Sequence, residues 1–122
     1  MKYKTDRVFN ELMAAPVMLQ YVAEEFNRIS RQLGVEPVLT RVLEEVEGSS
    51  GVHEDYRGID FRNEHKGVFL YTYEEVLAIE KYINDKFPRN DGRVTCIHHG
   101  FMGGPEHFHI QIPYLTKVLS RS

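Results

Sequence analysis

Apolar residues recur at helical spacing in the first third of the chain. Between Pro16 and Gly34 they are three or four residues apart, at Leu19, Val22, Phe26, Ile29 and Leu33. This spacing places them on one face of a helix. Proline suits the first turn of a helix and glycine its end, so we predict a helix between these two residues. A shorter pattern of the same kind predicts a brief helix within residues 1–15, at Val8, Phe9, Leu12 and Met13.

A second amphipathic helix is predicted over residues 73–87. Thr72 and Glu75 have the spacing of a capping box, in which each side chain accepts a hydrogen bond from the backbone of the other residue. The apolar residues after this box again share one helical face, at Val76, Ile79, Ile83 and Phe87. Pro88 and the polar loop after it are expected to end the helix.

Segments rich in β-branched and apolar residues predict strands over 36–46, 57–61, 93–98 and 107–113. The small polar residues 47–56 are typical of a loop. Short strands combined with two helices predict the α+β class: a small, mostly antiparallel sheet with helices packed on one face. A chain of 122 residues is long enough for one core and not for two, so we predict a single domain.

The composition excludes several classes of function. The net charge is -3 and no run of Lys or Arg is long enough to bind phosphates, so we expect no nucleic-acid partner. Cys96 is the only cysteine, which excludes an internal disulfide and a thiolate zinc cluster. No apolar stretch resembles a membrane span or a signal peptide. We therefore expect no membrane partner, and synthesis in the cytoplasm without a signal peptide.

The histidines are the first candidates for chemistry. The chain has 6, at positions 53, 65, 98, 99, 107 and 109. On the last predicted strand, His107, His109 and Gln111 share the face opposite the apolar residues, and burying such groups is costly unless they find partners. A zinc ion would be such a partner, because a catalytic zinc is typically bound by three protein ligands from His, Asp or Glu. His109 would be one ligand, and His53 and Asp60 the others if their segment folds against this face; a His-x-His pair alone is more often incidental.

Two motifs resemble those of a known family. His53-Glu-Asp-Tyr-Arg57-Gly-Ile-Asp60 resembles the H-x-x-G-R-A-x-D signature of the zinc D-Ala-D-Ala carboxypeptidase family, and Glu106-His-Phe-His109 resembles its second signature, E-x-x-H. The family includes phage L-alanyl-D-glutamate endopeptidases and shares its fold with the signalling domain of hedgehog proteins. The chain departs from the first signature at two positions, with Tyr in place of Gly and Gly in place of Ala.

The resemblance implies a set of zinc ligands and a catalytic carboxylate. His53, Asp60 and His109 would bind zinc. Glu106 would be the general base that takes a proton from the zinc-bound water and then protonates the leaving amine. The fold expected from the resemblance is the hedgehog/DD-peptidase fold.

Further residues would surround this centre. His107 would donate a hydrogen bond to the substrate or to the tetrahedral intermediate. In the family an upstream arginine stabilises the intermediate or holds the substrate carboxylate, and Arg41 is the nearest candidate, with Arg57 as its rival. His98 and His99 end a predicted strand beside the site, and we expect one of them to face the pocket.

The expected function is therefore that of a zinc metallopeptidase that hydrolyses an amide bond in peptidoglycan peptides. Such an enzyme would reach the cell wall through phage lysis or virion delivery. The alternative is a non-catalytic zinc-binding module with the same fold, structural or partner-binding, such as a virion component. A zinc hydrolase acting on another small amide is a third reading.

Overall fold

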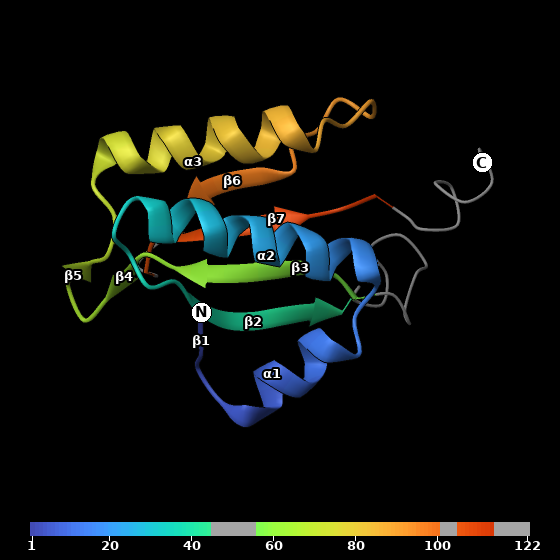
Figure 1. Ribbon diagram of the computed structural model, residues 1–122, viewed down its shortest axis with the longest axis horizontal. Coiled ribbons are helices and arrows are strands. Elements are labelled where there is room, and N and C mark those ends of the chain that lie inside the picture. The colour runs from blue at the N-terminus through green and yellow to red at the C-terminus, as the bar shows by residue number, and fades with distance from the viewer. Residues whose placement is uncertain (45–55, 101–104, 114–122) are drawn as a thin grey trace.

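A computed structural model describes residues 1–44, 56–100 and 105–113. The predicted α+β class is confirmed: three helices and a mixed five-stranded sheet form the described part of the chain (Figure 1). The elements follow in the order β1 (Lys2–Tyr3), α1 (Asp6–Met13), α2 (Val17–Gln32), β2 (Val38–Glu44), β3 (Tyr56–Arg62), β4 (Glu64–His65), β5 (Val68–Phe69), α3 (Tyr73–Lys86), β6 (Cys96–His99) and β7 (His107–Gln111).

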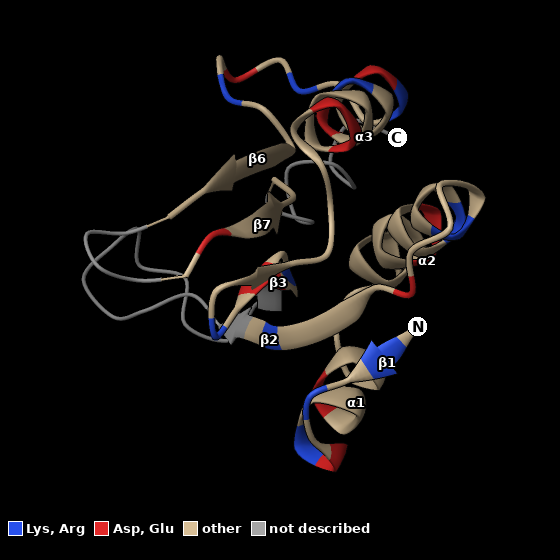
Figure 2. Cartoon of the chain, turned by 90° about the vertical axis from the view of Figure 1, so that its left-hand side faces the viewer, with Lys and Arg blue, Asp and Glu red and all other residues tan. Residues whose placement is uncertain are grey.

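The main sheet has the strand order β1-β2-β3-β7-β6. The pairs β2–β3, β3–β7 and β6–β7 are antiparallel, as the sequence predicts. The sheet is nevertheless mixed, because β1 pairs parallel to β2. Helices α2 and α3 lie on the same side of this sheet (Figure 2). The opposite side of the sheet carries the polar residues of β3 and β7.

An aromatic cluster forms the centre of the core between α2 and the sheet. Phe26 of α2 stacks on Phe61 of β3, with ring centroids 3.9 Å apart. Phe108 of β7 meets Phe26 edge to face at 5.0 Å, and Tyr71 meets Phe108 in the same way at 5.0 Å. Such pairs stabilise a core by about 0.5–1.5 kcal/mol beyond their buried area. The predicted faces of α2 and β7 therefore meet each other.

Helix α3 begins with the predicted capping box. The Thr72 hydroxyl accepts from the Glu75 backbone at 3.2 Å, and the Glu75 carboxylate accepts from the Thr72 backbone at 2.9 Å. Further along the helix, the Asn84 side chain bonds both backbone groups of Cys96, at 2.7 and 2.9 Å. This side chain takes the place of a strand partner and fixes the start of β6. Strand β6 spans Cys96–His99 and is shorter than the predicted 93–98.

The sequence pattern did not predict three of the strands, and each has only two residues. β4 and β5 form a hairpin whose turn residues, Lys66 and Gly67, both have positive φ, as in a type I′ turn. The predicted short N-terminal helix is confirmed as α1, which the Thr5 hydroxyl caps. Only part of its predicted apolar face is buried, since Phe9 and Met13 are exposed. The predicted loop 47–56 falls almost entirely outside the described residues.

Candidate functional site

The strand register aligns three predicted site residues across the sheet. Asp60 on β3 lies directly opposite His109 on β7, and Arg41 on β2 lies opposite Asp60 on its other side. Directly paired residues present their side chains on the same face of a sheet. This face is the one opposite the core, because the neighbours of Asp60 along the strand, Ile59 and Phe61, are fully buried among the helices. Arg41, Asp60 and His109 thus form one row.

A β-bulge puts Arg41 into this row. Leu39 pairs with Phe61 but Arg41 pairs with Asp60, so Thr40 is an additional residue in β2. Without the bulge, Thr40 would lie opposite Asp60. The Thr40 hydroxyl instead donates to the Asp60 backbone carbonyl at 3.2 Å and holds the bulge in place. An arginine therefore lies where regular pairing would place a threonine.

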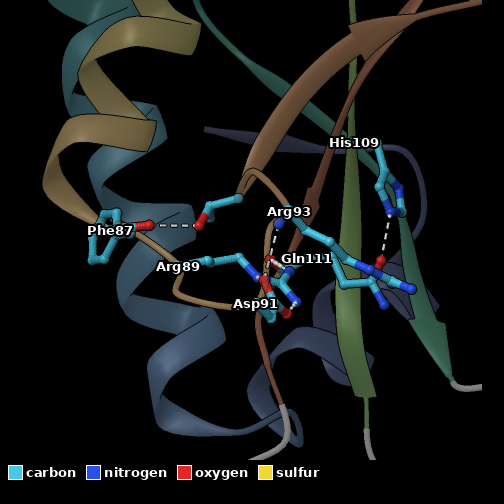
Figure 3. Close-up of polar contacts among 7 residues, drawn as sticks. Phe87, Arg89, Asp91, Arg93, His109 and Gln111 are labelled. Carbon is cyan, nitrogen blue, oxygen red and sulfur yellow. Dashed lines mark hydrogen bonds and ion pairs between the residues drawn. The ribbon is translucent and has the colours of Figure 1, made fainter.

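Asp60 and His109 are in direct polar contact. The carboxylate of Asp60 is 6% exposed, and its Oδ1 lies 2.9 Å from His109 Nδ1. This hydrogen bond raises the pKa of His109, while burial of the imidazole opposes the shift. His109 Nε2 lies 3.4 Å from Gln111 Oε1, on the same face of β7 (Figure 3). Gln111 Oε1 can accept a hydrogen bond from Nε2 while Asp60 accepts from Nδ1, so both imidazole nitrogens have an oxygen partner, which favours the protonated ring.

The strand end that carries Gln111 is fixed by the loop after α3. The Arg89 guanidinium is only 5% exposed; it donates to the Gln111 carbonyl at 2.9 Å and pairs with Asp91 (Figure 3). The Gln111 backbone in turn donates to the Thr95 carbonyl at 2.9 Å. These bonds fix the backbone of Gln111, whose side chain contacts His109.

The pair fits part of a zinc site. In a tetrahedral site with bonds of about 2.0–2.1 Å, two ligand atoms lie about 3.3 Å apart. The Asp60 and His109 atoms are 2.9 Å apart, so a small separation of the two side chains would give that spacing. His53, the third predicted ligand, lies outside the described residues. Within the ranges that the structure describes, no group of three His, Cys, Asp or Glu side chains could hold a metal ion.

Two more histidines extend the polar face toward β6. His107 Nε2 lies 3.9 Å from Asp60 Oδ2, and His107 Nδ1 lies 3.1 Å from the Pro105 carbonyl, to which it can donate. The His99 ring is 4.7 Å from that of His107 and 6.1 Å from that of His109. Burial, followed by repulsion from these two imidazoles, lowers the pKa of His99. His99 is therefore the histidine of β6 that faces the predicted site.

A cavity of about 260 Å³ brings four predicted residues together: Arg41, Asp60, Glu106 and His107 all line it. The side chain of Arg57, the rival arginine, is outside the described part of the chain. Lys4 and Arg62 also border the cavity, so cationic groups lie beside the carboxylates.

Glu106 lines both this cavity and a second one. Its backbone is fixed by Glu64, which donates its N–H to the Glu106 carbonyl at 2.9 Å and accepts from the Glu106 N–H at 3.3 Å. Its carboxylate is 46% exposed, and Oε1 lies 3.7 Å from His98 Nδ1. Glu106 and His98 both line the second cavity, of about 290 Å³, together with Asn63. The sequence reasoning missed Asn63 and Glu64, because neither belongs to a recognisable motif.

Comparison of the chain with protein-family models, with curated proteins and with solved structures finds no match. In the described part of the chain, no helix is long and apolar enough to cross a membrane. The site is therefore interpreted from its own geometry and from the two motifs in the sequence.

Proposed function

We propose that the protein is a zinc metallopeptidase that hydrolyses an amide bond in peptidoglycan peptides, built on a hedgehog/DD-peptidase-like fold. The observation that carries this proposal is the pairing of Asp60 with His109 across β3 and β7, beside the cavity that Glu106 lines. Asp60 of the first motif thereby lies beside His109 of the second. His53 would complete the ligand set.

Zinc at this position would polarise the scissile carbonyl and lower the pKa of water to about 7. Glu106 acts as the general base: its carboxylate takes a proton from the attacking water and passes it to the leaving nitrogen as the C–N bond breaks. Arg41 and His107, which line the same cavity, stabilise the negative charge that develops on the carbonyl oxygen.

The proposed substrate is the peptide of the cell wall. Lys4, Arg41 and Arg62 border the cavity, and their cationic groups suit a substrate with carboxylates near the bond that is cut. The protein would act at the wall after phage lysis or delivery by a virion.

The test is peptide release from purified peptidoglycan by the zinc-supplemented protein. Glu106→Gln should lower the rate by about 100-fold or more, because the general base is lost. Glu74→Gln is the matched control, since Glu74 is an exposed glutamate in the first turn of α3, and its rate should equal that of the wild type. Zinc binding without Glu106-dependent release would contradict the peptidase and leave the non-catalytic zinc-binding module.

A further inference from the structure

The orientation of the Asn63 amide is fixed by its partners. Asn63 is 2% exposed, and its Oδ1 accepts from the backbone N–H groups of Leu70 and Tyr71, at 3.2 and 2.9 Å. A flipped amide would bring its NH₂ group against these two donors and lose both bonds. The Nδ2 group must therefore point the other way, toward His98.

This orientation decides which nitrogen of His98 carries the proton. Asn63 Nδ2 lies 2.8 Å from His98 Nε2 and can only donate, so Nε2 must accept and cannot carry a hydrogen. A neutral imidazole has one N–H, which is then on Nδ1. Burial lowers the pKa of His98, which favours this neutral form.

The ring of His98 is also held in place. The backbone N–H of His98 donates to Glu80 Oε2 at 2.8 Å, and Phe108 packs edge to face against the ring at 4.9 Å. The side chain is only 11% exposed. The orientation of the ring is therefore fixed, with its Nδ1–H directed toward Glu106.

The Glu106 side chain, in contrast, is free to change its rotamer. His98 Nδ1 and Glu106 Oε1 are 3.7 Å apart, which is longer than a hydrogen bond. The Glu106 carboxylate is half-exposed, so rotation of its side chain can close the distance, whereas the buried imidazole has no such freedom. Hydrogen bonds of this kind often tighten only when substrate binds.

We propose that His98 is a positioning residue for Glu106: Asn63 fixes the imidazole with its proton on Nδ1, and this N–H holds one oxygen of the Glu106 carboxylate. The other oxygen is then directed to the cavity that Asp60 and His107 line. This inference rests on the proposed function of Glu106 as the general base. It assigns a role to the histidine of β6 that faces away from the predicted zinc site.

The first test is the tautomer of His98, read by NMR of the ¹⁵N-labelled protein without substrate. We expect Nδ1 to be protonated and Nε2 to be unprotonated. Glu106→Gln should shift the His98 Nδ1 signal, whereas Glu74→Gln should leave it unchanged. A proton on Nε2, or a Nδ1 signal that does not respond to Glu106→Gln, would overturn the proposal.

The second test separates positioning from stability with two amide replacements. The amide of His98→Gln reaches the place of Nε2 and keeps the bond with Asn63, but it offers no donor to Glu106. The amide of His98→Asn lies at the place of Nδ1 and keeps that donor, but leaves Asn63 Nδ2 without its partner. We expect His98→Gln to be the more stable variant and His98→Asn the more active one. For His98→Gln, kcat should fall by roughly 10- to 100-fold with little change in KM.

A merely structural role would give the two variants the same order in stability and in activity, and that result would overturn the proposal. The proposal would also be overturned if His98→Gln keeps the wild-type kcat under conditions in which Glu106→Gln abolishes peptide release. If the wild-type protein releases no peptide, the proposed function fails and the role in catalysis fails with it. The tautomer experiment then decides separately whether His98 and Glu106 are paired.

Discussion

Replacement of Asn63 by alanine gives the sharpest test of how the fold supports the site. The side chain bonds Leu70, Tyr71 and His98, but Leu70 N–H also donates to the Asn63 backbone carbonyl at 2.9 Å and keeps that partner in the variant. The Tyr71 N–H, which is buried, loses its bond to the side chain, at a cost of about 1–3 kcal/mol. The lost bond to His98 adds about 0.5–1.5 kcal/mol.

We therefore expect Asn63→Ala to lower the free energy of unfolding by about 1.5–4.5 kcal/mol, a large part of the stability of an average domain. The measurement is urea unfolding followed by circular dichroism. Asn90→Ala is the matched control, since Asn90 is exposed in the loop after α3, and we expect a change within about 0.5 kcal/mol. Equal losses in the two variants would refute the reasoning that Asn63 joins the end of β3 to the segment before α3 and to β6.

Other variants test the core and the pH dependence. Thr72→Ala removes the capping box of α3 and should lower the free energy of unfolding by about 0.5–2 kcal/mol in the same assay. Phe26→Leu removes the stacked contact with Phe61 and should lower the free energy of unfolding by about 1–3 kcal/mol. A decrease no larger than that of a substitution at an exposed position would contradict the aromatic core. Burial raises the pKa of the Tyr71 hydroxyl above its ordinary value of about 10, so its proton is held more tightly in the folded state. Stability should therefore be complete below pH 10 and fall above it, and Tyr71→Phe should flatten that fall in urea titrations between about pH 9 and 11.

The long elements could be predicted because their apolar residues repeat over several turns. Helices α2 and α3 and the two faces of β7 follow directly from such repeats. Two-residue strands such as β1 contain no period to detect, so the parallel pair was missed. The start of β6 was misplaced, because the strand begins where its pairing with β7 begins, at Cys96 opposite Ile110, and this pairing depends on a different segment.

The candidate site could be predicted in part from its motifs. Asp60 and His109 were named from signatures far apart in the sequence, and the register of β3 and β7 brings them together. The bulge at Thr40 that aligns Arg41 with Asp60 depends on the pairing of two strands, which no pattern in one strand specifies. The orientation of His98 likewise depends on Asn63, whose partners come from separate segments.

Zinc binding tests the central claim most directly, because the proposed chemistry requires Asp60 and His109 to be ligands. We expect the purified protein to bind about one zinc ion per chain, by metal analysis and calorimetry. Loss of a residue that only hydrogen-bonds a metal ligand typically weakens metal affinity by roughly 10- to 100-fold. Asp60→Asn and His109→Gln, which remove ligands themselves, should each weaken zinc affinity by more than this. Asp85→Asn, on the exposed face of α3, should retain the wild-type affinity. A wild-type chain that binds no zinc, or Asp60 and His109 variants that bind it as the Asp85→Asn control does, would contradict the account.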